Sequence, residues 1–317
     1  MTRPRSTLVS LEDTPYYHCI SRCVRRAFLC GQDRFTGQSF NHRKPWLVKR
    51  IRLLSSVFAI DIAAYAIMSN HYHLVLHVDQ ARSEEWSDDE VIDRWLLLHK
   101  GPILIQRYKK GESLHPAQLK KVFAIASVWR ARLSNISWFM ARLNEHIARK
   151  ANQEDNCTGR FWEGRFKSKA LLDDKALLST MAYVDLNPIR AGIARNLKES
   201  SFTSIQDRIQ ELAGKKLKNK PPLMAFSESK ALAAPGATLP FNLKNYIELV
   251  DWTGRIVKRG KRGFIASSEP KLLSTLALTP TEWEYLALAI QKRAINTIHG
   301  LDRLTALRAQ QPKILAA

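Results

Sequence analysis

The chain contains two consecutive apolar runs, at residues 59–67 and 71–78, separated only by Met68-Ser69-Asn70. Two β-rich runs with so short a connection predict a β-hairpin. The second run begins His71-Tyr72-His73. Because side chains alternate between the faces of a strand, the two imidazoles are expected to emerge side by side while Tyr72 faces the other way. Such a pair offers two ligands to one divalent metal ion, although a His-x-His pair on a strand is by itself more often structural.

The elements around this hairpin predict an α+β fold. A strand is expected within residues 14–30, a second within 160–169 and a helix at about 175–187. Apolar side chains recur at helical spacing in two further segments, residues 41–58 and the segment from Ile136 to Ile147. The order strand, helix, strand, strand, helix, strand, helix is that of a ferredoxin-like antiparallel sheet of four or five strands, with helices on one or both faces.

The chain is expected to divide into three parts. Residues 1–200 would form the main domain, with a mostly helical insertion at about 80–134. A basic run followed by a segment rich in alanine and proline predicts a linker over 201–240. Residues 241–317 would form a smaller, mostly helical C-terminal region of unknown role.

The charge of the chain indicates a polyanionic partner. It has 50 lysines and arginines against 29 aspartates and glutamates, a formal net charge of +21. An excess of this size most often serves nucleic-acid binding. The sequence shows no uninterrupted apolar stretch of membrane-spanning length and no secretion signal, so a cytoplasmic protein without a membrane partner is expected. Cys19, Cys23 and Cys30 lie near His18, but their spacing matches no usual zinc-ligand set, and reduced thiols are the better interpretation.

A second polar segment, Tyr183-Val184-Asp185-Leu186-Asn187-Pro188, lies on the predicted helix at 175–187. Residues four apart share a helix face, so Tyr183 and Asn187 are expected on one side and Asp185 on the other. If this helix crosses the sheet near the histidine pair, a hydroxyl and an amide oxygen reach the same place. Alternatively, Tyr183 packs in the core and Asn187 caps the helix end.

The motifs together resemble those of single-tyrosine HUH transposases, and most closely the REP-associated tyrosine transposase branch. The resemblance covers roughly residues 14–195. It is carried in order by Asn70-His71-Tyr72-His73, by Gly164-Arg165-Phe166-Lys167 after an aromatic residue, and by Tyr183 with Leu186-Asn187-Pro188-Ile189-Arg190-Ala191-Gly192. It implies metal-dependent cleavage and rejoining of single-stranded DNA through a 5′-phosphotyrosine intermediate, next to short hairpins.

The resemblance also implies roles for individual residues. His71, His73 and Asn187 would hold Mg²⁺ or Mn²⁺, and Tyr183 would be the nucleophile. Glu163 could replace Asn187 as a ligand, and Tyr108 is a distant rival nucleophile. Asn70 would either orient a ligand or suit the turn. His77 shares the strand face of the histidine pair but lies too far along the strand to join it on one metal ion.

Cationic residues near these motifs are candidate contacts to DNA phosphates. Arg165, Lys167 and Lys169 alternate on one predicted strand face, and Arg22, Arg25 and Arg26 follow the first strand. Arg190 would contact a phosphate or cap the helix end. The aromatic residues Phe161, Trp162 and Phe166 would stack on exposed bases or pack in the core.

The sequence therefore predicts a DNA transposase acting on single-stranded or hairpin DNA, as a monomer or a homodimer. The alternative is a domesticated DNA-binding protein that keeps the fold but no longer cuts. A replication-initiation or relaxase nuclease with the same chemistry is less favoured, because those enzymes usually order their motifs differently or carry a helicase domain.

Overall fold

The computed structural model describes residues 9–24, 29–33, 36–217, 219–227, 238–259, 270–289 and 297–298. One sheet lies at its centre, with the strand order β2-β3-β1-β4-β7. The first four of these pair antiparallel, and β7 adds a short parallel edge beside β4. The strands are β1 (Tyr16–Arg22), β2 (Ile60–Ile67), β3 (His71–Val78), β4 (Lys167–Leu171) and β7 (Thr297–Ile298), and β5 (Ala225–Phe226) pairs separately with β6 (Thr238–Leu239).

The predicted α+β, ferredoxin-like fold is confirmed. The core follows the expected order, and the four antiparallel strands have the expected arrangement with β1 and β3 at the centre. The core helices are α1 (Lys44–Val57), α6 (Ile136–Glu154) and α7 (Asp174–Asp185). The others are α2 (Gln80–Glu85), α3 (Asp88–Leu96), α4 (Ile103–Lys109), α5 (Pro116–Leu133), α8 (Asn187–Arg190), α9 (Ser204–Leu212), α10 (Leu243–Arg259), α11 (Lys271–Thr275) and α12 (Pro280–Ala289).

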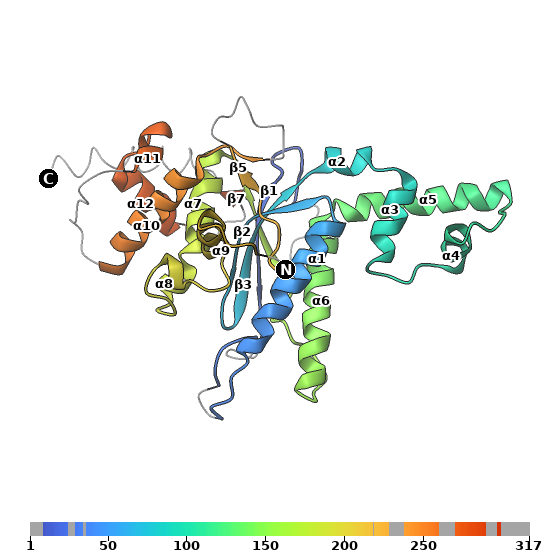
Figure 1. Ribbon diagram of the computed structural model, residues 1–317, viewed down its shortest axis with the longest axis horizontal. Helices are drawn as coiled ribbons and strands as arrows, with labels where there is room; N and C mark the ends of the chain where they lie inside the picture. The colour runs from blue at the N-terminus through green and yellow to red at the C-terminus, as the bar shows by residue number, and fades with distance from the viewer. Residues whose placement is uncertain are drawn as a thin grey trace.

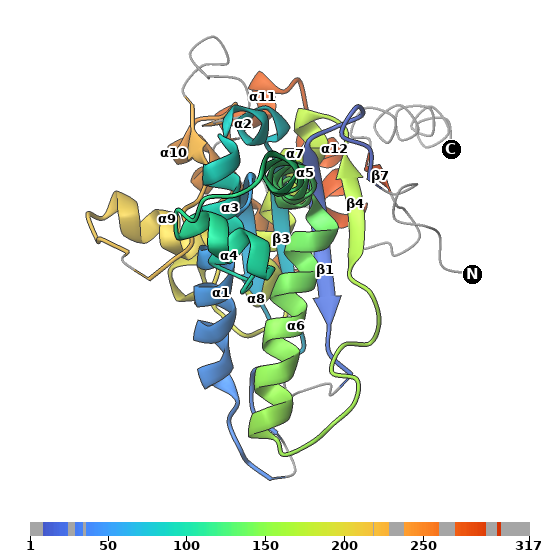
Figure 2. The ribbon, with the colours of Figure 1, turned by 90° about the vertical axis from the view of Figure 1, so that its right-hand side faces the viewer.

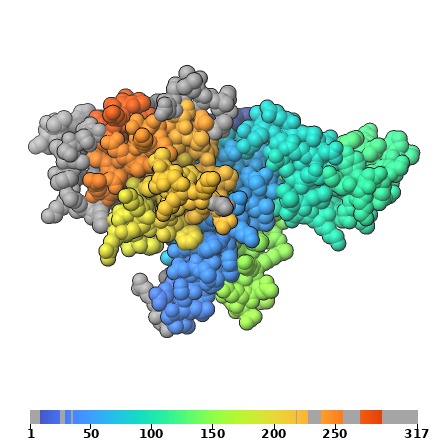
Figure 3. All heavy atoms as spheres, in the orientation of Figure 1, coloured from blue at the N-terminus to red at the C-terminus, as the bar shows by residue number. Residues whose placement is uncertain are grey.

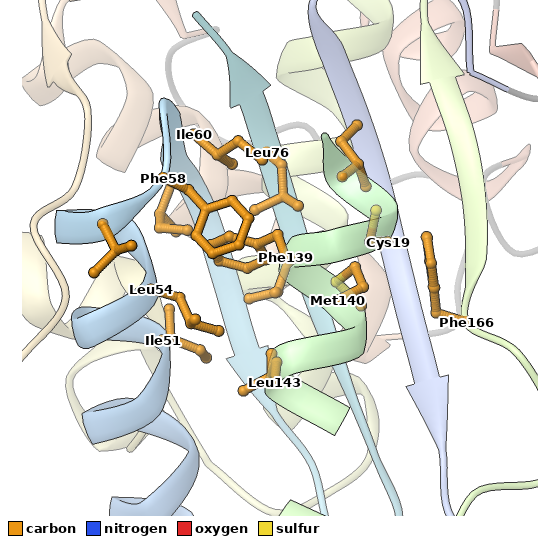
Figure 4. Close-up of a cluster of buried hydrophobic side chains, with 14 of the residues drawn as sticks. Cys19, Ile51, Leu54, Phe58, Ile60, Leu76, Phe139, Met140, Leu143 and Phe166 are labelled. Carbon is orange, nitrogen blue, oxygen red and sulfur yellow. The ribbon is translucent and has the colours of Figure 1, made fainter. Parts of the chain in front are cut away.

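Helices cover both faces of the sheet, which Figure 1 shows nearly edge-on. α1 and α6 lie side by side on one face (Figure 2). Their apolar stripes meet alternate strand residues in a buried core that includes Leu54, Phe139, Leu76 and Cys19 (Figure 4). α7 covers the other face, in a second core with Val75 and the C-terminal helices. Strand alternation thus separates two surfaces, and the histidines of β3 belong to the α7 face.

The predicted insertion corresponds to α2–α5. These helices run from Gln80 to Leu133 between β3 and α6, and they project from the body of the molecule (Figures 1 and 3). Trp95 and Trp129 stack in their interior with ring centroids 5.1 Å apart. The insertion therefore has its own aromatic packing and leaves the order of the core elements unchanged.

Two predicted element bounds are corrected by the structure. Strand β4 begins at Lys167 rather than near 160, because the chain before it pairs with the end of β1 only through an isolated bridge between Trp162 and Cys23. The helix expected at 175–187 ends at Asp185. Pro188 has no backbone N–H, and its ring would clash with the preceding turn if the helix continued, so a new short helix begins at Asn187.

The segment expected to be a linker, 201–240, contains α9. A β-bridge joins Thr203 to Ala66, and the backbone N–H of Tyr65 donates to Ser204 Oγ at 2.9 Å. This part of the chain is therefore folded against β2. The C-terminal region is helical over its described part, as expected, while the division of the chain into domains stays a prediction. None of the helices in the described ranges is long and apolar enough to span a membrane.

Candidate active site

The two histidines of β3 lie next to one another on the α7 face of the sheet. The ring centroids of His71 and His73 are 4.8 Å apart, as strand alternation predicts. His73 is buried, with 2% of its surface exposed. Tyr72 points into the opposite core, where its hydroxyl donates to Asn144 Oδ1 at 2.6 Å. The strand is thus anchored by one face and presents imidazoles on the other.

Each imidazole is held through its Nδ1 atom. His71 Nδ1 lies 2.6 Å from Asn70 Oδ1, and because an amide oxygen only accepts, the imidazole donates and its Nε2 carries the lone pair. This contact favours an orienting role for Asn70. His73 Nδ1 lies 2.9 Å from Nε2 of His18 in β1. His73 Nε2 is buried and has no partner in the described part of the chain.

The surroundings keep these imidazoles neutral. Burial, aided by the charge of Arg22, lowers the pKa of His71 to about 4. Burial and the charge of Lys169 lower the pKa of His18 to about 3, and burial with the neighbouring imidazoles holds the pKa of His73 well below its usual range. Neutral imidazole is the form that binds a metal ion.

Helix α7 brings Tyr183 onto the histidine pair. The helix is capped at its start by Asp173, whose side chain accepts a hydrogen bond from the backbone N–H of Ala176. Two turns later the half-buried ring of Tyr183 meets His73 edge-on, with ring centroids 5.7 Å apart, and His18 at 6.2 Å. Tyr183 therefore lies at the histidines, whereas Tyr108 packs against Phe123 in the insertion.

Asn187 is tied to the backbone of Tyr183 and belongs to a second, short helix. It is the first residue of α8, and its Nδ2 donates to the backbone carbonyl of Tyr183 at 3.1 Å. The side chain is 9% exposed. This hydrogen bond occupies the amide nitrogen, which leaves the amide oxygen as the candidate metal ligand.

Three cationic residues flank this group. The guanidinium of Arg190 lies 5.4 Å from the ring centroid of Tyr183. Lys169 is buried opposite His18 in the β1–β4 ladder, and Arg22 stands opposite His71 in the β1–β3 ladder. These positions suit contacts to a phosphate bound beside the tyrosine.

The other candidate DNA contacts lie elsewhere or are not described. Arg165 lies in the loop before β4, so the predicted alternation holds only for Lys167, which is exposed, and Lys169. Arg25 and Arg26 fall outside the described residues. The aromatic residues expected either to stack on bases or to join the core are all buried, namely Phe161, Trp162 and Phe166.

The alternative ligands have other surroundings. His77 contacts Asp61 and the ring of Tyr16, in keeping with a structural role. Glu163 is exposed, and its backbone N–H donates to the carbonyl of Arg22. The three N-terminal cysteines are buried and reduced. In the ranges that the structure describes, no three His, Cys, Asp or Glu side chains form a metal-binding group, so a metal ion here requires an oxygen ligand such as the Asn187 amide.

Sequence reasoning missed the role of His18. It shares the α7 face of β1 with Tyr16 and Ile20, and its ring stacks on that of His73 with centroids 5.1 Å apart. In a ferredoxin-like sheet β1 is the neighbour of β3, so a histidine on this face of the first strand was the available signal.

Comparisons with known proteins add little to this geometry. No protein-family model and no curated protein matches the chain. One solved structure, a REP-associated tyrosine transposase bound to a REP hairpin, is similar over 67% of this chain and 93% of that one, with 12% identity and a TM-score of 0.33. A likeness this weak carries no argument about function.

Proposed function

We propose that the chain is a DNA transposase that cleaves and rejoins single-stranded DNA through a covalent 5′-phosphotyrosine. The observation that carries the proposal is the packing of Tyr183 against His73, with Asn187 hydrogen-bonded to the backbone of the same tyrosine. The order of the sequence motifs and the net charge of +21 support it.

The residues present fit a divalent metal ion. His71 and His73 are neutral and fixed through Nδ1, so their Nε2 atoms would be ligands, and the amide oxygen of Asn187 would be the third. This mixed nitrogen and oxygen set suits Mg²⁺ or Mn²⁺. The metal ion would supply positive charge to the scissile phosphate and to the departing 3′ oxygen.

The chain's own residues supply the covalent step. A phenol is a weak nucleophile near neutral pH and needs a positioned, charge-stabilised target. The oxygen of Tyr183 forms a bond to phosphorus while the bond from phosphorus to the 3′ oxygen breaks. The phenolic proton passes to solvent, and the 3′ oxygen takes up a proton. Arg190 and Lys169 stabilise the charge of the phosphate. The reverse step with another 3′-hydroxyl joins strands without an added energy source.

The arrangement supports a site completed within one chain. Tyr183 contacts histidines of the sheet that its own helix covers, so exchange of α7 with a second copy is not needed. We therefore propose that a monomer is competent for cleavage.

The test is formation of a covalent adduct. The parent protein, Tyr183→Phe and, as a matched control, Tyr108→Phe are incubated with single-stranded DNA carrying a hairpin, with Mn²⁺ or with EDTA, and separated on denaturing gels. We expect an adduct from the parent and the control in Mn²⁺ only, and none from Tyr183→Phe. Binding by all three proteins with no adduct would refute cleavage and favour the non-cleaving DNA-binding protein.

A further inference from the structure

We propose that a cation-lined groove between α1 and α6 binds the phosphate backbone of the DNA on the sheet face opposite Tyr183. We call it the α1–α6 groove. Its cations lie on two helices, Lys49, Arg50 and Arg52 on α1 and Arg142, Arg149 and Lys150 on α6. The proposal rests on the proposed function in one respect, that the polyanion is DNA.

The groove consists of two adjoining hollows. One, of about 520 Å³, is lined by Arg50, Arg142, Arg149 and Lys150, together with His99 from the insertion. The other, of about 780 Å³, shares Arg50 and Lys150 with the first and adds Lys49 and Arg52. Arg50, His146 and Lys150 line both hollows, so the two lie next to one another.

Positive charge in the groove exceeds the negative charge, because its six cations on α1 and α6 face only two carboxylates that line the hollows, Glu145 and Glu211. The carboxylate of Glu145 is shared by Arg142 and Arg149, with N–O distances of 2.8 and 2.6 Å. Lys49, Arg52 and Lys150 form no ion pair with any residue in the described ranges. The α1–α6 groove is thus left with unneutralised cations that attract an anion.

Buried polar atoms without a partner and repulsion among the cations also favour an anion as the ligand of the groove. Arg142 Nε and His99 Nε2 are buried and have no hydrogen-bond partner within the described part of the chain. Burial and the neighbouring Arg142 lower the pKa of Arg50, and burial with Arg50 and Lys150 lowers the pKa of His146. A phosphate in the groove would relieve the repulsion between the cations.

The length of the cationic row and its guanidinium groups fit a nucleic-acid backbone. On α6, Arg142 lies two turns before the adjacent Arg149 and Lys150, and the three residues span about 12 Å of the helix axis. A duplex strand carries one charge about every 3.4 Å of axis, so this length matches roughly three phosphates. Guanidinium groups, which supply four of the six cations, fit phosphate oxygens in a two-pronged geometry.

The position of the groove determines which part of the DNA reaches it. α1 and α6 cover one face of the sheet, and α7 with Tyr183 covers the other (Figures 1 and 2). A short single strand at Tyr183 stays on the α7 face. The duplex arm of a hairpin, which continues beyond the cleaved strand, is the segment that would occupy the α1–α6 groove.

The test compares two triple variants with the same loss of charge. The groove variant is Lys49→Gln, Arg52→Gln, Lys150→Gln, and the control is Lys100→Gln, Lys120→Gln, Lys121→Gln, whose lysines are exposed on the insertion. Affinity for a fluorescent hairpin-bearing oligonucleotide is measured between 50 and 200 mM KCl. The logarithm of affinity falls with the logarithm of salt concentration, and each lost phosphate contact makes this negative slope shallower by about 0.9. Three lost contacts mean that the parent loses about 40-fold more affinity than the groove variant over this range.

The outcomes separate this proposal from the proposed function. We expect the negative slope to become shallower in the groove variant and to change by less than one in the control. Adduct formation on a short unpaired oligonucleotide should be unchanged in both variants. Equal slopes for the two variants would overturn the groove while leaving cleavage intact. A shallower slope in the groove variant, with no adduct from the unmodified protein, would support DNA binding in the groove and refute the transposase. Binding of fluorescent polyglutamate is measured in parallel, and a groove variant that keeps the salt dependence of its DNA binding but no longer binds polyglutamate would show an acidic protein partner instead.

Discussion

Substitution of Tyr246 by phenylalanine tests how the C-terminal helices hold the helix that carries Tyr183. The hydroxyl of Tyr246, on α10, donates to Asp185 Oδ2 at 2.6 Å, and both side chains are fully buried at the end of α7. Ser204 Oγ and the backbone N–H of Ile205 donate to the other carboxylate oxygen. One carboxylate therefore joins α7, α9 and α10.

The ionisation of Asp185 sets the expected magnitude. Burial raises the pKa of its carboxyl to about 6, so the group is charged at pH 7.5 and mostly protonated at pH 5. A hydrogen bond to a charged group contributes about 1.5–3 kcal/mol and one between neutral groups about 1 kcal/mol. Tyr246→Phe should therefore lower the free energy of unfolding by about 2–3 kcal/mol at pH 7.5 and by only about 1 kcal/mol at pH 5.

Tyr72→Phe is the matched control, since its equally buried hydroxyl donates at the same 2.6 Å to the neutral amide of Asn144. It should cost about 1 kcal/mol at both pH values. Urea unfolding followed by circular dichroism, with the midpoints compared at constant m-value, measures the difference. Equal costs for the two variants, unchanged between pH 7.5 and pH 5, would refute a charged Asp185 as the link between α7 and α10.

Two further predictions concern the histidines. In EDTA, acidification from pH 7 to 5.5 should lower the free energy of unfolding. The unfolded chain takes up protons near the ordinary pKa of 6.5, whereas His71 and His18 hold pKa values of about 4 and 3 in the folded protein and that of His73 is also lowered. The contribution of the three histidines to the free energy of unfolding is therefore complete above about pH 6.5 and is lost as the pH falls below it. The raised pKa of Asp185 acts in the opposite direction and offsets about 1 kcal/mol, which leaves a net loss of roughly 3 kcal/mol at pH 5.5. Urea titrations in which stability stays flat or rises on acidification would contradict this prediction. Second, His18→Phe should weaken Mn²⁺ binding about 10-fold, because the contact that orients His73 is lost. In His18→Gln the amide oxygen can accept a hydrogen bond from His73 Nδ1, so part of the affinity should be recovered. Affinity is measured from the electron paramagnetic resonance signal of free Mn²⁺. Parent-like affinity in His18→Phe would exclude an orienting role.

Local regularities made much of the site predictable. Strand alternation alone places His71 and His73 together, and the apolar runs with their short connections give the order of the core elements. Tyr183 on a helix also follows from local pattern. These features depend only on residues close together in the sequence, so they can be predicted from a single sequence.

Other features depend on which segments become neighbours. The pairing of β1 with β3 brings His18 to His73, and that of β1 with β4 buries Lys169 beside His18. The break before Pro188 shifts Asn187 from the helix of Tyr183 to the start of α8. The proline gave a local warning, but the hydrogen bond back to Tyr183 depends on the geometry after the break.

The sequence by itself determined the strand and helix order, the side-by-side histidines and the strong positive charge. Only the tertiary structure decided where that charge gathers, because Arg50 and Arg142 come from helices far apart in the chain and meet where α1 packs against α6. The hydrophobic core aligns these helices through their inner faces, and the cations on their outer edges become neighbours as a consequence of that packing.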